Sequence, residues 1–262
     1  MCQSKTSTPY ESYIMNRKTF FFTLVSSVFL CDAQTKFNLI TVLYNETNIN
    51  RMHEYLVCLQ YNLLNKSIHT VHVIYDTSKD DNKNTFLHLL KLKPAIKLTL
   101  TNHRPSYGEC FALANTEYPK CKIILSNADI FFNDSLASLE NYNFTNIFLT
   151  LTRWNILENG ALEIFKQYDK NGVFSKSDSE SSQDVWIFET PLKIFKCDDI
   201  ALGLMQCDSI IAYRAIKSGL IVKNPCLSIQ CCHLHLTEKK NYRKQPQPYK
   251  GQPTAIVPWE KL

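Results

Sequence analysis

Short apolar runs alternate along the first half of the chain with segments in which apolar residues recur every three or four positions. The apolar runs predict buried strands at residues 37–44, 71–75, 95–100 and 121–125. The helical spacing predicts helices at residues 49–64 and 108–115, and a third that opens with the polar residues 77–84. Strands that alternate with helices in this way indicate an α/β fold with a parallel sheet and right-handed crossovers.

The second half of the chain has a less regular pattern. It predicts strands at 146–151, 185–188, 220–223 and 227–236, and a helix at 208–218 that ends before Gly219. The polar segment 153–182 contains two glycines and a serine-rich run, so we expect a mobile loop there. The prolines and basic residues of 237–262 predict a weakly packed tail, which leaves residues 36–236 as a single domain.

The N-terminal residues 1–35 have a different composition. Arg17 and Lys18 precede an apolar run from Phe20 to Leu30, and small residues follow it, which is the order typical of a secretory signal peptide. We expect a signal peptide or short anchor here, with possible membrane association through residues 15–33; the alternative is a buried strand or helix. A signal places the protein in the secretory pathway or cell envelope, and its absence leaves it in the cytoplasm.

Composition narrows the function classes only slightly. The chain has 262 residues, a net charge of +5 and ten cysteines. It lacks a dense basic block with interleaved aromatic residues, so we expect no nucleic-acid partner. No C-x-x-C spacing occurs, which argues against a zinc ribbon or a redox pair, and most of the cysteines are expected to be small buried hydrophobes.

Polar residues follow the predicted strands at the points where they end. Asp129 lies directly after the strand at 121–125, where a buried carboxylate would be costly unless something pairs with it. Parallel sheets bind ligands beyond the carboxyl ends of their strands. We therefore expect Tyr44–Asn45, Asp76, the 101–107 loop and Asn127–Asp129 to lie together along one edge of the sheet, facing a ligand.

Several of these segments occur in an order that resembles a known family. They are VLYNETN, the strand-terminal Asp76, YGECFALAN, SNADIFF, SQDVWIF and HLH, and they span roughly residues 37–236. The set resembles the GT-A type glycosyltransferases, nucleotide-diphospho-sugar transferases similar to family 2. The resemblance implies an α/β fold with a single Rossmann-like domain, in which helices flank a mixed, mostly parallel central sheet. The resemblance implies a nucleotide-sugar donor, a glycan, lipid or protein acceptor, and a divalent metal, Mn²⁺ or Mg²⁺.

The resemblance also implies roles for individual residues on the donor side. Donor-binding residues would be Tyr44, Asn45, Glu46, Asp76, Arg104, Tyr107, Asn127 and Asp129. The helix that begins near Gly108 would point its N-terminal N–H groups at the diphosphate. Metal ligands would be Asp129, at the last position of a D-x-D-like motif, and one or both of His233 and His235. The first position of that motif is Asn127 rather than aspartate, which leaves metal dependence open.

On the acceptor side, the resemblance makes Asp184 the expected catalytic base of an inverting transferase. Trp154, Trp186 and Asp208 would line the acceptor site. Local structure offers an alternative for each carboxylate, because Asp184 and Asp208 also suit helix caps.

Two further hypotheses remain open at this level. A nucleotidyltransferase would share much of the fold, but it is expected to have a glycine-rich basic loop after the first strand, where this chain has YNETNIN. A catalytically decayed GT-A scaffold, acting as a carbohydrate-binding or interaction protein, is the alternative that the Asn127 substitution keeps open.

Overall fold

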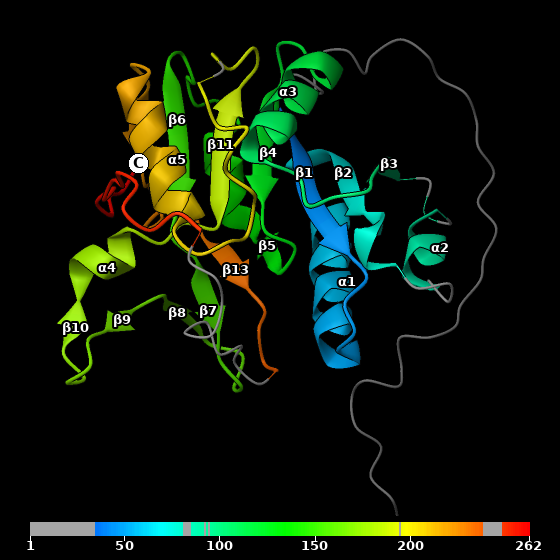
Figure 1. Ribbon diagram of the computed structural model, residues 1–262, viewed down its shortest axis with the longest axis horizontal. Coiled ribbons are helices and arrows are strands. Elements are labelled where there is room, and N and C mark those ends of the chain that lie inside the picture. Colours follow the sequence, from blue (N-terminus) through cyan, green and yellow to red (C-terminus); the bar gives the residue numbers. More distant parts are fainter. Residues whose placement is uncertain (1–34, 81–84, 92, 94, 194, 238–247) are drawn as a thin grey trace, which may run out of the picture.

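A seven-stranded sheet in the order β12-β6-β11-β4-β1-β2-β3 organises the chain (Figure 1). The computed structural model describes residues 35–80, 85–91, 93, 95–193, 195–237 and 248–262. Neighbouring strands run parallel except at β11, which is antiparallel to both β4 and β6. The predicted α/β fold with a mixed, mostly parallel sheet is confirmed.

The elements of the main domain have the following bounds. The strands of the sheet are β1 (Phe37–Tyr44), β2 (Ile68–Asp76), β3 (Ile96–Thr101), β4 (Lys122–Ser126), β6 (Ile147–Leu151), β11 (Val185–Glu189) and β12 (Ile221–Lys223). The helices in the described residues are α1 (Ile49–Leu64), α2 (Thr85–Lys91), α3 (Tyr107–Glu117), α4 (Lys176–Glu180) and α5 (Cys207–Lys217), and 3-10 turns cover Thr77–Lys79 and Asp134–Leu139.

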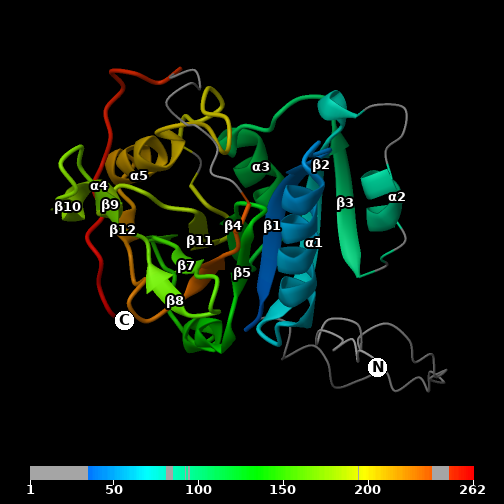
Figure 2. The ribbon, with the colours of Figure 1, turned by 90° about the horizontal axis from the view of Figure 1, so that it is seen from below.

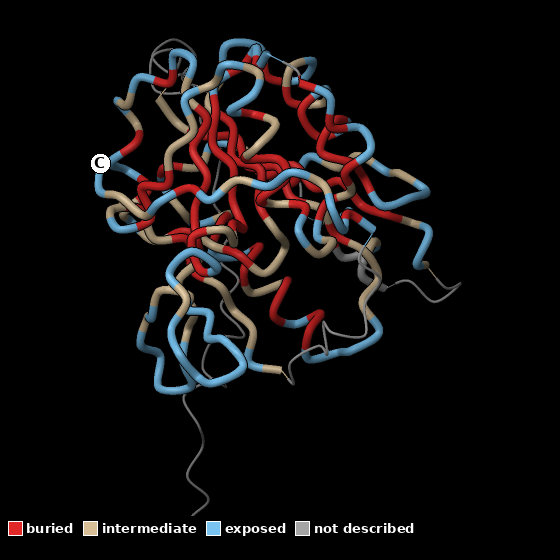
Figure 3. The backbone as a smooth tube through the Cα atoms, turned by 60° about the vertical axis from the view of Figure 1, so that its left-hand side comes forward, coloured by how far each residue is buried: buried red, intermediate tan, exposed pale blue. Residues whose placement is uncertain are grey.

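The sheet separates two hydrophobic cores. On one face, α1 packs Met52, Tyr55 and Leu59 against the strands; on the other, α3 and α5 contribute residues such as Phe111 and Ile211. Buried residues gather in the central strands between these layers (Figure 3). Burial on both faces explains why the strands are almost continuously apolar, as is typical of parallel sheets.

A smaller sheet, in the order β5-β13-β7-β8, lies below the main one (Figure 1). Its strands are β5 (Ile130–Phe132), β13 (Cys231–His233), β7 (Trp154–Ile156) and β8 (Leu162–Ile164), and a hairpin of β9 (Gln167–Tyr168) and β10 (Phe174–Ser175) follows. The prediction of a mobile loop at 153–182 is therefore wrong. Local composition concealed these strands because β7 pairs with β13, which lies far away in the sequence. The strand predicted at 227–236 is also shorter than expected.

The described part of the C-terminal tail, residues 248–262, is packed rather than loose. Tyr249 and Val257 are buried, and the backbone contacts α5, α4 and the residue after β12 as the segment passes them (Figure 2). The predicted weak packing does not hold for these residues. The prolines beside Tyr249 and Val257 suggested an irregular tail, and nothing in the sequence indicated that these two side chains are buried.

Among the residues that the structure describes, none of the helices has the length and the apolar character that a membrane span needs. The predicted signal or anchor at 15–33 lies outside the described residues.

Candidate functional site

The carboxyl edge of the sheet opens into a cleft of about 750 Å³. Its lining includes most of the polar residues that were predicted to meet there. They are Tyr44, Asp76, Arg104, Asn127, Asp129, Asp184, His233 and His235. Asp184 precedes β11, and because β11 is antiparallel to its neighbours, its first residues lie at the same edge as the ends of β1, β2 and β4. The rule that ligands bind beyond the ends of parallel strands therefore places this cleft correctly.

Asp129 is one of the two carboxylates at the centre of the polar network. It lies between β4 and β5, and its Oδ2 accepts from the guanidinium of Arg51 and faces His233 Nε2 at 3.1 Å. The Asp129 side chain is only 13% exposed. Burial acts to raise the pKa of this carboxyl, but the charges and hydrogen bonds of His233 and Arg51 outweigh burial and hold the pKa well below its usual range.

Asp129, His233 and His235 together suit a metal ion. One potential ligand atom from each lies within 4.8 Å of the others. His235 Nε2 is buried and has no hydrogen-bond partner among the described residues. Burial, helped by Arg51 and His233, lowers the pKa of His235 to about 4, so the ring is neutral at pH 7. A neutral imidazole with an unused buried nitrogen is the form in which histidine binds metals.

Asn155 gives His233 the support that metal-binding histidines usually have. Its Oδ1 lies 3.1 Å from His233 Nδ1. A hydrogen bond from Nδ1–H to this oxygen fixes the ring orientation and directs Nε2 toward Asp129. The residues present therefore fit a divalent cation.

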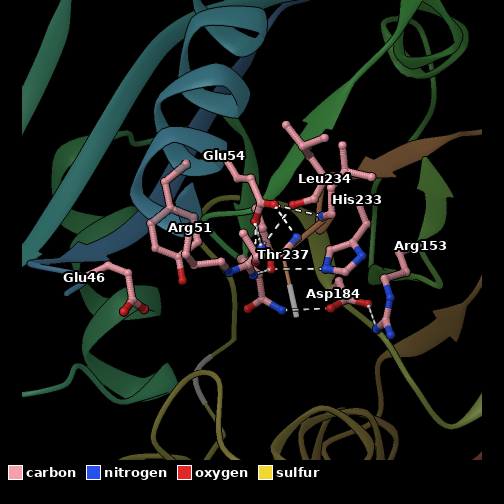
Figure 4. A network of polar contacts seen from close by, with 12 residues as sticks. Glu46, Arg51, Glu54, Arg153, Asp184, His233, Leu234 and Thr237 are labelled. Atoms are coloured by element: carbon pink, nitrogen blue, oxygen red, sulfur yellow. Dashed lines mark hydrogen bonds and ion pairs between the residues drawn. The ribbon is translucent and has the colours of Figure 1, made fainter. Parts of the chain in front are cut away.

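A buried ion pair on α1 connects Asp129 to the segment after β13. Figure 4 shows Arg51 and Glu54 of this pair beside Leu234 and Thr237. Arg51 Nη1 donates to Glu54 Oε2 at 2.5 Å and to the Leu234 carbonyl at 3.1 Å. Glu54 in turn accepts from the backbone N–H groups of Leu236 and Thr237 at 2.8 and 2.9 Å. These bonds hold the histidine segment against α1.

Asp184 is the second carboxylate, and both of its oxygens have partners. Oδ1 accepts from the Asn127 amide at 2.9 Å. Oδ2 accepts from Arg153 Nη1 at 2.9 Å (Figure 4). The Arg153 guanidinium lies 3.9 Å from the centre of the Phe165 ring, and its Nε donates to Asn155. Arg153 thus links the Asp184 carboxylate to the residue that orients His233.

The nucleotide side of the cleft is only partly as expected. Tyr44 OH lies 3.1 Å from Glu46 Oε2 and 3.2 Å from Tyr55 OH. Asp76 is buried at the end of β2 and accepts from the backbone N–H of Ser78 at 2.9 Å. Asn45 and Glu46 do not line the cleft, although both follow β1 directly.

Tyr107 and the start of α3 do not face the cleft as expected. Tyr107 is fully buried, and its hydroxyl contacts Cys207 Sγ at 3.4 Å. The backbone N–H of Gly108 bonds to the Cys197 carbonyl, and the Asp198 carboxylate lies against Gly108. An anion and a carbonyl of the chain itself therefore occupy the helix N-terminus that we expected to bind diphosphate.

The three residues predicted on the acceptor side also lie outside the cleft lining. Trp186 alternates onto the α3 face of β11, where it is fully buried against Tyr107. Trp154 donates its indole N–H to the Cys226 carbonyl. Asp208 accepts from the backbone N–H of Gln183 at 3.0 Å. Gln183 lies outside α5, whose N-cap residue is Gln206, so this contact ties α5 to the residues before β11 and is not the predicted helix cap. Burial, with a smaller contribution from Asp184, raises the pKa of Asp208 to about 6.

Sequence reasoning missed Arg51, Glu54, Arg153 and Asn155. Arg51 and Glu54 lie on the helical face of Tyr55 and Cys58, at spacings of three and four, so their burial was readable from the pattern. Arg153 follows β6 as Asp129 follows β4, and the same strand-end rule applies to it. The assumption of a loop at 153–182 hid that signal.

Neither a scan against protein-family models nor a search of curated proteins finds a match for the chain. Solved structures do match. A mannosyltransferase from Pyrobaculum calidifontis, in complex with GDP-mannose and Mn²⁺, has 14% identity and a TM-score of 0.50 over 79% of this chain and 58% of its own. This chain therefore spans a little more than half the length of that protein.

Two other solved structures are similar at lower scores. GalNAc-T7 with UDP, GalNAc and Mn²⁺ has 10% identity and a TM-score of 0.49, over 76% of this chain and 44% of its own. A Bacillus anthracis protein described as a glucose-1-phosphate thymidylyltransferase, in complex with a sucrose, has 10% identity and a TM-score of 0.43, over 72% and 86%. The mannosyltransferase match and the sheet topology show that the fold is the GT-A type of nucleotide-diphospho-sugar transferases.

Proposed function

We propose that this protein is a glycosyltransferase that transfers a sugar from a nucleotide-diphosphate donor to an acceptor hydroxyl with inversion. The observation that carries the proposal is the meeting of two carboxylates in one cleft. Asp129 lies with two histidines in a set that suits a metal, and Asp184 lines the same cleft outside that set. The two carboxylates have different partners, as two different roles require.

The donor would lie along the ends of β1, β2 and β4. Asp76 and Tyr44 line the cleft where the base and ribose would bind, and Arg104 adds a positive charge for the diphosphate. Asn45 and Glu46 lie outside the lining, and Glu46 would act through Tyr44, whose hydroxyl lies 3.1 Å from Glu46 Oε2. The cleft lining also holds Arg51, so it offers anion-binding groups that the helix N-terminus does not.

Asp129, His233 and His235 would hold the divalent cation. When bound, such an ion would neutralise negative charge on the diphosphate as it leaves. Of the two predicted metals, Mn²⁺ is the better match, since Mg²⁺ strongly favours oxygen ligands and two of these three groups are imidazoles.

Asp184 would act as the base. Each carboxylate oxygen has a second lone pair beyond the bonds from Asn127 and Arg153, so an acceptor hydroxyl can donate to Asp184. The acceptor oxygen would attack the anomeric carbon as its proton passes to Asp184. The bond from that carbon to the diphosphate oxygen breaks on the opposite face, and the configuration inverts.

Separate measurements of donor binding and of turnover distinguish the proposed role of Asp129 from that of Asp184. The full chain is titrated calorimetrically with UDP-, GDP- and CMP-sugars with and without Mn²⁺, and release of nucleotide is followed. We expect Asp129→Ala to lose the metal-dependent part of donor binding, and Asp184→Asn to bind donor normally while turnover falls at least 100-fold. A folded wild-type chain that binds none of the donors would favour the decayed-scaffold alternative.

A further inference from the structure

The Asp129 carboxylate is paired with a permanent cation. Arg51 is 5% exposed and directs Nη2 at Asp129 Oδ2 from the first turn of α1. Its guanidinium also lies 4.9 Å from the centre of the Tyr55 ring. Arginine does not lose its charge in proteins, so this pairing is present at every working pH.

The position of Arg51 conflicts with a divalent ion at the same carboxylate. Asp129 Oδ2 already faces both Arg51 and His233. An ion bound by Asp129, His233 and His235 would lie close to the Arg51 guanidinium, which is paired with the same Asp129 carboxylate. Both side chains of this pair are largely buried, so little water screens the repulsion between the ion and the guanidinium. The two cations therefore compete for one carboxylate.

We propose that Arg51 is a built-in competitor of the divalent cation, and that metal binding breaks the Arg51–Asp129 ion pair. This inference rests on the proposed placing of the metal on Asp129. The new element is that Arg51 occupies the Asp129 carboxylate until the ion displaces it. The metal affinity then depends on how much more strongly the ion interacts with Asp129 than Arg51 does, and not on the three ligands alone.

The remaining contacts of Arg51 make the displacement feasible. Arg51 keeps Glu54 and the Leu234 carbonyl as partners when it leaves Asp129, so its charge stays compensated. Glu54 is also held by the backbone of Leu236 and Thr237, which fixes it on α1. Arg51 also lines the cleft, so its guanidinium borders the space that an entering ion would cross.

The test is the Mn²⁺ affinity of the full chain without any nucleotide, measured by calorimetry and by the loss of the free-ion electron paramagnetic resonance signal. Arg51→Gln keeps a hydrogen-bonding group and removes the charge, and we expect it to bind Mn²⁺ at least tenfold more tightly than the wild type. Arg104→Gln is the matched control, because it removes the same charge from the same cleft and is not among the ion-pair partners of Asp129. We expect its affinity to change less than threefold.

Equal or weaker binding by a folded Arg51→Gln variant overturns the proposal, and so does an equal gain in Arg104→Gln. If Arg51→Gln does not fold, the wild-type chain labelled with ¹⁵N-arginine is titrated with Mg²⁺. One guanidinium signal, identified by its loss in Arg51→Lys, should shift, and an unchanged signal at saturation overturns the proposal. Failure of every form to bind metal also overturns it, whereas donor binding in EDTA would leave the transferase proposal standing.

Discussion

The side-chain amide of Asn127 donates to the Asp184 carboxylate at 2.9 Å. This contact gives a structural role to Asn127, the first residue of the segment that resembles a D-x-D motif. An aspartate at position 127 would place two carboxylates within hydrogen-bonding distance of each other. The asparagine amide carries no charge and donates a hydrogen bond to Asp184. Asn127 therefore supplies Asp184 with a hydrogen-bond donor, so this residue alone does not argue for the decayed-scaffold alternative.

The first prediction concerns that contact. Asn127→Asp should lower the free energy of unfolding by about 1–3 kcal/mol at pH 8, since it replaces a hydrogen bond with like charges. Repulsion raises the pKa of one carboxyl of the pair, so the loss is present above that pKa and recovers as the pH falls toward 5. Urea unfolding across this range measures it. The control Asn127→Ala removes the bond without adding charge, and a loss of the same size at every pH in both variants would contradict the prediction.

The position of the cleft was predictable from the sequence for those residues whose place depends only on the order of the strands. Asp76 ends β2 and Asp129 follows β4. Ligands bind beyond the carboxyl ends of parallel strands, and this rule brings the two residues together without any knowledge of side-chain packing. Asp184 reaches the same edge only because β11 runs antiparallel, and nothing in its short apolar pattern gives strand direction. Its place was inferred from resemblance, and strand pairing supplies the physical reason.

Side-chain orientation on the elements was less predictable. Tyr107 and Trp186 lie close in sequence to residues of the cleft, but both point into the core on the α3 face of the sheet. For a strand buried on both faces, the alternation of apolar and polar residues that would reveal orientation is absent. The Arg51–Asp129 pair likewise depends on how α1 packs against β5, which is a tertiary contact with no local signature.

The second prediction concerns the pH dependence of stability near Asp208. Its pKa is raised from 3.8 to about 6, chiefly by burial. The folded state binds this proton more tightly than the unfolded state, so the contribution is full below pH 3.8 and is lost as the pH rises through 6. Relative to Asp208→Asn, the wild type should lose about 2 kcal/mol of unfolding free energy between pH 4 and 7.

Asp199 supplies the opposite control for this measurement. A hydrogen bond from Arg214 lowers the pKa of Asp199, and so its contribution to stability is present above pH 3.8 and is lost as the pH falls. The difference between wild type and Asp199→Asn should thus have the reverse slope. Parallel stability curves for wild type and Asp208→Asn would refute the raised pKa.

The third prediction tests whether Asp198 closes the N-terminus of α3. A Cβ at Gly108 would lie 2.0 Å from Asp198 Oδ1 and 3.1 Å from its Cα. Gly108→Ala should therefore cost about 2–3 kcal/mol of unfolding free energy, as an overpacked site does. Asp198→Ala in the same chain should recover much of the loss, a coupling that a double-mutant cycle measures.

Gly160→Ala separates this steric effect from backbone strain. Gly160 has a φ of +80°, and a Cβ there meets nothing within 4 Å, so its substitution should cost only about 1 kcal/mol. If both glycine variants lose the same amount and Asp198→Ala recovers nothing, the helix N-terminus is open and remains a candidate for binding diphosphate.

The last prediction concerns the C-terminal segment as a support for the cleft. The Trp259 indole donates to Thr152 Oγ1 at 3.0 Å, and that hydroxyl donates to the Ser182 carbonyl at 3.0 Å. Thr152 directly precedes Arg153, the partner of Asp184. Trp259→Phe should cost about 1–2 kcal/mol through the lost hydrogen bond and packing, measured by urea unfolding.

Ile256→Ala is the control for a general effect of changing this segment, because Ile256 is 52% exposed and its loss should cost less than about 0.5 kcal/mol. The position of Arg153 gives the prediction a second consequence. A segment that holds Thr152 also holds Arg153 over Phe165, so Trp259→Phe should slow turnover more than it weakens donor binding. Equal stability of the two variants would mean that the segment lies on the domain without supporting it, and the cleft would then be built by the sheet edge alone.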